Sequence, residues 1–161
     1  MTDRSAPQGP PGPPGLHRPF RPRLARVVSL GLAVLVALTS VALVLGLPSV
    51  APSWDTPASR VSILAFGALI VWFLARQAGV VARPDESGLT VRNLAVTRHV
   101  TWAEIVSVRF GQGRPWVQLD LADGDVLPVM AVQSADGALA AAEAQRMATL
   151  VAYHSRTARD D

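Results

Sequence analysis

The sequence predicts a membrane hairpin of two α-helices followed by a small α+β domain, an antiparallel β-meander capped by one C-terminal helix. Three observations predict this fold class. Two long apolar runs occupy the first half of the chain. A stretch in which apolar and polar residues alternate follows them, as in half-buried strands. The last segment is rich in alanine and has the apolar spacing of a helix.

The first apolar run, from Val27 to Leu47, contains no charged residue. As a helix rising ~1.5 Å per residue it would be about 31 Å long, close to the thickness of the hydrocarbon core of a bilayer. Pro48 is expected to end this helix, because proline lacks the backbone N–H and clashes with the preceding turn. A cleaved signal peptide fits less well, because Pro52 directly follows the candidate cleavage site.

The second apolar run lies between Arg60 and Arg76, and its uncharged part would be only ~22 Å long as a helix. Counting from Pro57 to Ala78 gives ~33 Å, which is enough if both arginines reach towards the interfaces. Thr56 is expected to cap this helix, with Pro57 in its first position. The short linker predicts antiparallel helices that pack through small side chains. These are Ala33, Ala37 and Ser40 on the first helix and Ser62, Ala65 and Ala68 on the second.

The arginines predict how the hairpin lies in the membrane. They are concentrated before the first helix and after the second, whereas the linker between the helices carries only Asp55. The positive-inside rule therefore predicts a multi-pass protein of the cell membrane with both termini in the cytoplasm. We expect four segments: a disordered Pro/Gly/Arg-rich tail (1–26), a two-helix transmembrane hairpin (27–78), a folded domain (79–155) and a flexible C-terminus (156–161).

The domain is expected to contain strands near 80–82, 89–92, 96–101, 106–110, 117–121 and 126–132. Asp123-Gly124 is typical of a tight hairpin turn between the last two. Ser134 is then expected to cap a helix over residues 135–154. The alternating apolar residues expected to form the core under this helix are Leu89, Val91, Val106, Val108, Phe110, Val117, Leu119 and Leu121.

Three segments of this domain resemble the small bacterial pleckstrin-homology (PH) domains that follow two transmembrane helices in actinobacterial membrane proteins. They are GLTVRN at 88–93, TRHVTWAEIVSVRF at 97–110 and PWVQLDLADGDVLPVMAV at 115–132. The resemblance covers roughly residues 57 to 155. It implies a PH-like, partly open antiparallel β-barrel capped by a helix, with no enzymatic activity and no settled ligand. Fewer strands can be counted than in a full PH domain, so the barrel could be incomplete.

The residue types give little support to a catalytic or metal-binding site. The chain has no cysteine, its three histidines are far apart in the sequence, and no nucleophile–base arrangement can be identified. The acidic run from Asp120 to Asp125 resembles a fragment of a calcium loop, but it lacks the downstream glutamate and is better explained as a hairpin turn. We therefore expect no enzyme activity, no cofactor and no metal.

The basic residues do not predict a nucleic-acid partner. All 15 are arginine, and the net charge is only +3. Nucleic-acid binding would need a clustered basic face, and the clearest cluster lies in the N-terminal tail, next to the first apolar run.

These observations favour a non-enzymatic integral membrane protein whose cytoplasmic PH-like domain is a protein-interaction module, with an unidentified protein or a second copy as partner. The alternative is a module that binds anionic lipid headgroups at the inner leaflet. The loop from Arg83 to Ser87 carries two acids against one arginine, which argues against capture of an inositol phosphate. The residues expected to contact a lipid or a partner are Arg92, Arg98, Arg109, Arg114, Trp102 and Trp116.

Overall fold

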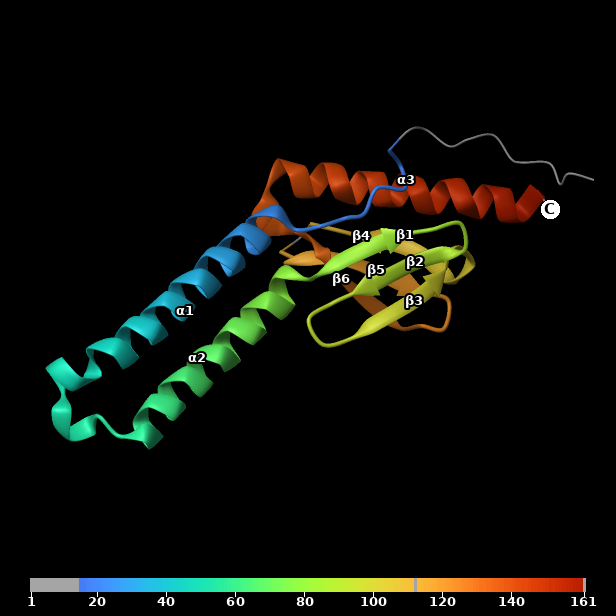
Figure 1. Ribbon diagram of the computed structural model, residues 1–161. Helices are drawn as coiled ribbons and strands as arrows, with labels where there is room; N and C mark the ends of the chain where they lie inside the picture. The colour runs from blue at the N-terminus through green and yellow to red at the C-terminus, as the bar shows by residue number, and fades with distance from the viewer. Residues whose placement is uncertain (1–14, 112, 161) are drawn as a thin grey trace, which may run out of the picture.

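The computed structural model describes residues 15–111 and 113–160. The chain forms two long helices that extend from a smaller domain of two sheets and one helix (Figure 1). The first residues of the predicted tail, 1–14, lie outside the described part.

The two N-terminal helices form the expected antiparallel hairpin. Helix α1 spans Arg23–Val50, a short 3-10 turn spans Pro52–Trp54, and α2 spans Pro57–Ala78. Both helices are long and apolar enough to cross a membrane. The prediction that Pro48 ends α1 is wrong, because Pro48 lies within the last turn of that helix. A proline there removes one hydrogen-bond donor, but the turn still closes through the amide of Ala51, which donates to the carbonyl of Leu47 at 2.9 Å.

The start of α2 is as predicted. The amide of Ser59 donates to the Thr56 hydroxyl at 3.1 Å, and Pro57 occupies the first helical position. The guanidinium of Arg60 donates to both carboxylate oxygens of Asp55, at 2.6 and 2.8 Å. The charge at this end of the hairpin is therefore neutralised by a pair between the linker and the first turn of α2.

The helices pack against each other along one narrow stripe, which is partly the predicted one. Ser29 and Ala33 are buried on α1, and Gly67 and Leu74 on α2. A Cβ atom at Gly67 would collide with the side chain of Ser40, so glycine permits a close approach at this crossing. The prediction was wrong for four small residues that face outward: Ala37, Ser62, Ala65 and Ala68. They are small enough to pack closely, but they do not lie on the face that contacts the other helix. That face consists of residues three or four positions apart, counted from Ala33 on α1 and from Gly67 on α2.

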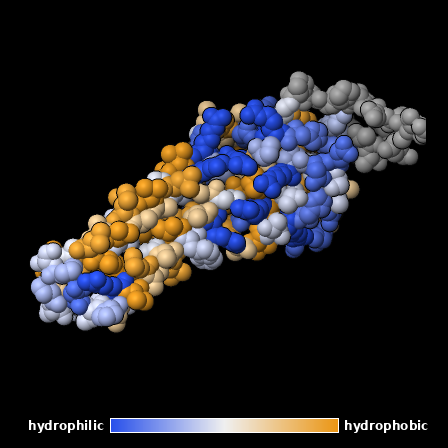
Figure 2. Space-filling model, in the orientation of Figure 1, coloured by the Kyte–Doolittle hydropathy of each residue, from blue (hydrophilic) through white to orange (hydrophobic). Residues whose placement is uncertain are grey.

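The remaining surface of the hairpin is apolar on all sides. Figure 2 shows this as a hydrophobic band between the polar tip of the hairpin and the hydrophilic domain. Many large side chains in this band are more than half exposed, for example Val27, Leu38, Leu45, Phe66 and Leu69. Such a surface is unfavourable in water and is typical of contact with lipid.

The domain consists of two three-stranded antiparallel sheets and a helix. The first sheet has the order β1 (Val81–Pro84), β2 (Gly88–Arg92), β3 (Thr97–Thr101). The second has the order β4 (Ile105–Arg109), β5 (Trp116–Leu121), β6 (Val126–Gln133). A 3-10 turn at Trp102–Glu104 leads from one sheet to the other. The described strands thus form two sheets and no closed barrel, which confirms the predicted antiparallel α+β domain with an incomplete barrel.

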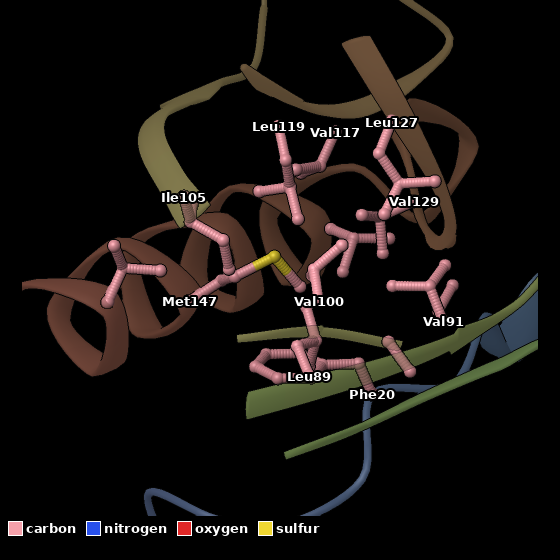
Figure 3. Packing of buried hydrophobic residues seen from close by; sticks show 14 of the residues in the cluster. Phe20, Leu89, Val91, Val100, Ile105, Val117, Leu119, Leu127, Val129 and Met147 are labelled. Carbon is pink, nitrogen blue, oxygen red and sulfur yellow. The ribbon is translucent and has the colours of Figure 1, made fainter. Parts of the chain in front are cut away.

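Helix α3 (Ala138–Asp160) lies across both sheets and completes the core (Figure 1). Met147 and Leu150 of this helix are fully buried, and Met147 points towards Ile105 and Val100 (Figure 3). The helix starts later and ends later than predicted. A 3-10 turn at Ser134–Asp136 and Gly137, with a φ of 59°, come before it, and the Ser134 hydroxyl donates to the carbonyl of Pro115 instead of capping the helix. Residues 156–160, expected to be flexible, continue the helix.

The core contains most of the predicted residues, with one error of phase. Leu89, Val91, Val117, Leu119 and Leu121 are buried as expected. Val106 is 66% exposed, whereas its neighbour Ile105 is buried. The register between β4 and β5 shifts between Ile105 and Ser107, and this bulge turns Val106 outward. Val108 and Phe110 are only partly buried against the core.

The second half of the predicted tail is part of the domain. We call residues 15–22 the strap. Phe20 of the strap is fully buried in the core (Figure 3). Its amide donates to the carbonyl of Ala82 at 2.8 Å, and the amide of Ala82 donates back at 3.1 Å, so the strap pairs with the free edge of β1. The prediction of a disordered tail up to residue 26 is therefore wrong from residue 15 onward, because the burial of an aromatic side chain and the pairing with β1 dock this segment.

Candidate functional site

The most distinctive region lies where the hairpin joins the domain. Helix α1 begins there, α2 ends there, and β1 follows α2 after only two residues. Because both helices meet the domain at this one end, any group at the junction lies next to the end of the apolar band (Figures 1 and 2).

Hydrogen bonds to the domain hold the ends of both helices. The carboxylate of Asp136, which lies just before α3, accepts hydrogen bonds from the amides of Arg23 and Leu24 at 3.0 and 2.8 Å. It thus caps α1, whose own N-cap residue is a proline without a capping side chain. At the end of α2, the Arg76 guanidinium donates to the carbonyl of Leu94 at 3.0 and 3.2 Å. The junction is therefore built from specific contacts.

A cleft of about 160 Å³ opens at the junction, between the strap, both helices and the first sheet. We call it the juxtamembrane cleft. Four arginines line it, together with the backbone around residues 78–81: Arg21, Arg26, Arg83 and Arg92. Arg83 and Arg92 project from the same face of neighbouring strands, because Val81 pairs with Arg92 in the ladder and Arg83 lies two residues further along.

The four guanidinium groups of the juxtamembrane cleft have no counter-charge among the residues that the structure describes. Within residues 15–111 and 113–160, none of them forms an ion pair or a side-chain hydrogen bond. A Cβ atom at Gly79 would lie 2.5 Å from Nη2 of Arg92, so the glycine makes room for that side chain. Four like charges without partners repel one another and attract an anion.

Only one of the predicted contact arginines lies in this cleft. Arg92 does, but Arg98 pairs with Asp123 and Asp125 at 3.3 and 3.1 Å. Arg109 pairs with Asp120, which also accepts from the Ser107 hydroxyl. Arg114 donates to the side-chain oxygen of Gln118 at 3.1 Å. The carboxylates of the acidic run therefore have arginine partners on the domain surface.

The two predicted tryptophans lie away from the cleft. Trp102 is only 5% exposed, and its Nε1 donates to the carbonyl of Asp85 at 3.0 Å, so the structure places it in the core. Trp116 is partly buried at the start of β5.

The turn between β1 and β2 has the opposite charge from the juxtamembrane cleft. Asp85 accepts from the Ser87 hydroxyl at 2.6 Å and from the amides of Ser87 and Gly88, each at 2.9 Å. The Ser87 hydroxyl, followed by these amides, holds the pKa of the Asp85 carboxyl below its usual range. The turn therefore carries a fixed negative charge at neutral pH, which disfavours a phosphate at this end of the strands.

A second cluster joins residues that the sequence analysis described as scattered. Nε2 of His17 in the strap lies 3.1 Å from Nε2 of His154 in α3. The ring of His154 stacks on Trp102, with centroids 4.5 Å apart and planes 3° from parallel. Burial, and then the nearby charge of His17, lower the pKa of His154. No group of three or more ligand-type side chains within the described residues could hold a metal ion, so this pair is best understood as a contact between strap and helix.

The comparison with known proteins agrees with this architecture. The family model for the bacterial PH domain matches residues 72–149. Uncharacterised proteins of Mycobacterium tuberculosis and Mycobacterium bovis are 34% identical over 136 residues, which is 83% of this chain and 88% of theirs. The chain belongs to the bacterial PH domain family. The length shared with these relatives exceeds the matched PH segment, so the similarity includes residues outside the PH domain. No solved structure matches the chain.

The sequence analysis missed three of the four cleft arginines. Arg21 and Arg26 were counted as part of a tail, and Arg83 as part of an acidic loop. The register of the β1–β2 hairpin could have placed Arg83 beside Arg92. The strap, however, meets the PH domain through contacts between segments far apart in the sequence, such as the burial of Phe20, and no local pattern predicts them.

Proposed function

We propose that this protein is a non-enzymatic membrane-anchored module that binds the phosphate of an anionic lipid headgroup in its juxtamembrane cleft. One observation carries the proposal: four arginines without counter-charges line a cleft at the ends of two helices that are long and apolar enough to span a bilayer.

The chemistry of arginine supports a phosphate ligand. Its planar guanidinium can donate two parallel hydrogen bonds to phosphate oxygens and stays charged at any physiological pH. Each arginine near an anionic surface contributes about 1 kcal/mol of attraction. A phosphodiester without a cation of its own would relieve the mutual repulsion of the four cleft arginines, whereas in a zwitterionic headgroup the attached cation already balances the phosphate.

The position of the cleft supports a lipid as the source of that phosphate. The apolar band of the hairpin ends where the strap and the first sheet begin (Figure 2). Headgroups of a surrounding bilayer would therefore lie at the level of the cleft. The arginines on both sides of the hairpin favour an orientation with the PH domain in the cytoplasm, so the relevant headgroups are those of the inner leaflet.

A protein partner, which the sequence analysis favoured, is the alternative. An acidic peptide could pair with the same arginines, but it would bind without regard to the lipid composition of the membrane. The two roles therefore predict different results when the protein is purified with lipid and no other protein. A lipid-binding cleft retains anionic lipid, and a peptide-binding cleft does not.

The experiment measures lipid retention by the full chain in a neutral detergent. Native mass spectrometry would count bound phosphatidylglycerol and, as the neutral comparison, phosphatidylcholine. We expect selective retention of the anionic lipid by the unaltered protein. Loss of two cleft arginines in R83Q/R92Q should weaken this binding roughly 10- to 30-fold, from about 1 kcal/mol per charge.

The matched control is R98Q/R114Q, which removes the same charge from positions outside the cleft. It should retain the anionic lipid as the unaltered protein does. Equal retention by R83Q/R92Q and R98Q/R114Q would exclude the cleft as the lipid site. Retention of neither lipid by the correctly folded protein would favour a protein partner.

A further inference from the structure

A second basic cleft adjoins the first near the start of α1. It has a volume of about 490 Å³ and lies between the strap, the first turns of α1 and the start of α3. We call it the strap cleft. Arg18 and Arg23 line it, and Arg21 and Arg26 line both clefts. The two clefts are therefore neighbouring sites around one end of α1, joined by two shared arginines.

From this arrangement we infer that the preferred ligand is a lipid with two phosphate groups, of the diphosphatidylglycerol (cardiolipin) type, with one phosphate in each cleft. This inference rests on the proposed function and specifies its lipid class.

The acidic groups near the strap cleft are already engaged. Glu143 pairs with Arg146 at 2.5 Å. Asp136 is occupied by the amides at the start of α1, which it caps. Neither carboxylate forms an ion pair with Arg18, Arg21, Arg23 or Arg26, and Asp136 contributes one negative charge at the edge of the cleft, beside the start of α1.

Arg146 also lines the strap cleft, but its guanidinium has a structural role. It donates to the carbonyls of Leu16 and Arg18 at 2.7 and 2.9 Å and lies over the ring of Phe20, 3.7 Å from its centroid. It thus fixes the strap to α3 and is not counted as a ligand-binding charge.

Six arginines then remain in the two clefts, the four of the juxtamembrane cleft together with Arg18 and Arg23. No ion pair or side-chain hydrogen bond engages any of these six within the part of the chain that the structure describes. One phosphodiester carries a single negative charge and can occupy only one cleft. Two phosphodiesters on one short linker match the number of clefts, and they offset twice as much of the positive charge as a single phosphodiester does.

The strap cleft also has an apolar wall suited to a lipid. Pro22, Val27 and Leu139 line it beside the arginines. Val27 is 71% exposed and begins the apolar band of α1. The glycerol and the first acyl carbons of a lipid whose phosphate lies among the arginines could cover these side chains, whereas a soluble phosphate compound would leave them exposed.

The experiment compares two lipids at equal phosphate concentration, with the full chain in a neutral detergent. Cardiolipin supplies two linked phosphates and phosphatidylglycerol one. For the unaltered protein we expect cardiolipin to bind at least about tenfold more tightly per phosphate, since its second phosphate binds at a high effective concentration. The variant R18Q/R23Q alters the strap cleft alone and should abolish this advantage. It should change phosphatidylglycerol binding to the juxtamembrane cleft less than about threefold, because Arg18 and Arg23 do not line that cleft.

The other variants separate the two proposals. R83Q/R92Q should weaken both lipids, and R98Q/R114Q neither. Equal binding of both lipids per phosphate, with loss of both in R83Q/R92Q, would overturn the two-phosphate inference and leave the proposed function intact. Unchanged binding of both lipids in R83Q/R92Q and in R18Q/R23Q would overturn both.

A competition with inorganic pyrophosphate tests the source of the phosphates. We expect millimolar pyrophosphate to displace cardiolipin only weakly, because it cannot cover the apolar wall of the strap cleft. If pyrophosphate displaces bound cardiolipin as effectively as free cardiolipin does at the same phosphate concentration, the clefts bind a soluble anion. That result would overturn the assignment of a lipid ligand. The thermal unfolding temperature of each variant is compared with that of R98Q/R114Q. Similar temperatures would show that a variant has lost lipid binding without unfolding.

Discussion

Single polar side chains connect parts of this protein that its sheets and helices leave unconnected. The two sheets of the PH domain share no ladder, yet the side chain of Asn93 links them. Its Nδ2 donates to the carbonyl of Pro128 at 2.7 Å, and its Oδ1 accepts from the amide of Met130 at 3.2 Å. Asn93 directly follows β2, whereas both partners lie in β6. This residue therefore fixes one sheet relative to the other.

Asn93→Ala should destabilise the PH domain by about 1–3 kcal/mol, because it leaves a partly buried carbonyl and amide without partners. Urea unfolding of the full chain in detergent, followed by tryptophan fluorescence, would measure the change. Gln133→Ala is the control, since Gln133 donates only to Met130 of its own strand. An equal effect of the two substitutions would mean that Asn93 is no special link.

The contact of His17 with His154 predicts that acid weakens the docking of the strap. The folded protein lowers the pKa of His154, so protonation below the ordinary value of about 6.5 is less favourable when folded than when unfolded. The stabilisation is therefore complete above that value and is lost as the pH falls through the lower pKa of the folded state.

Thermal unfolding between about pH 8 and pH 5 would measure this loss, with His154→Gln as the test variant. The variant cannot become protonated, so its stability should fall less with pH than that of the unaltered protein. The matched control is His99→Gln, whose histidine lies on β3 and contacts the Thr90 hydroxyl at 3.0 Å. If His99→Gln reduces the pH dependence as much as His154→Gln does, the pair of His17 and His154 is not its cause.

At the scale of elements, the strap extends the PH domain to residues that precede the hairpin. Phe20 fills the core from a segment that precedes the hairpin, whereas the rest of the core follows it. The hairpin is thus inserted between two parts of one hydrophobic core. Asp136 adds a second connection, because it lies before α3 and caps the start of α1. Through these contacts the domain holds α1 at its base.

Phe20→Ala should cost about 3–5 kcal/mol, the usual range for a fully buried phenylalanine, and should undock the strap. Phe110→Ala is a useful comparison, because Phe110 is only partly buried and should cost less. Urea unfolding of the full chain would give both values, and limited proteolysis near Arg18 would report the release of the strap. A larger effect at Phe110 would contradict the assignment of Phe20 to the core.

The elements also show what the sequence could and could not predict. Hydropathy located both helices, alternation located the strands, and Asp123-Gly124 located a turn, because each of these signals is local. Val106 was assigned to the wrong face, since a bulge depends on how two strands pair. The clefts depend on the strap meeting β1 and on α1 meeting α3. Such contacts between distant segments leave no periodic pattern, so Arg92 was expected at a contact surface and its neighbours Arg21, Arg26 and Arg83 were not.

At the scale of the whole molecule, charge is distributed unequally between the two ends of the hairpin. The linker end has Asp55 paired with Arg60, so it carries little net charge. The domain end has the arginines of both clefts. Moving that end across a membrane would require desolvation of many arginines, whereas the linker end crosses with a neutral pair. The clefts lie at the arginine-rich end, so the orientation of the hairpin determines which leaflet the clefts face.

We predict that the linker lies outside the cytoplasm and both termini inside it. Reporters that are active on only one side of the membrane should give opposite results when fused after Pro52 and at the C-terminus. An N-terminal fusion is the control and should agree with the C-terminal one. The same side for the linker and the C-terminus would exclude a spanning hairpin. An external C-terminus would place both clefts against the outer leaflet, and the lipid experiments would then have to use the lipids of that leaflet.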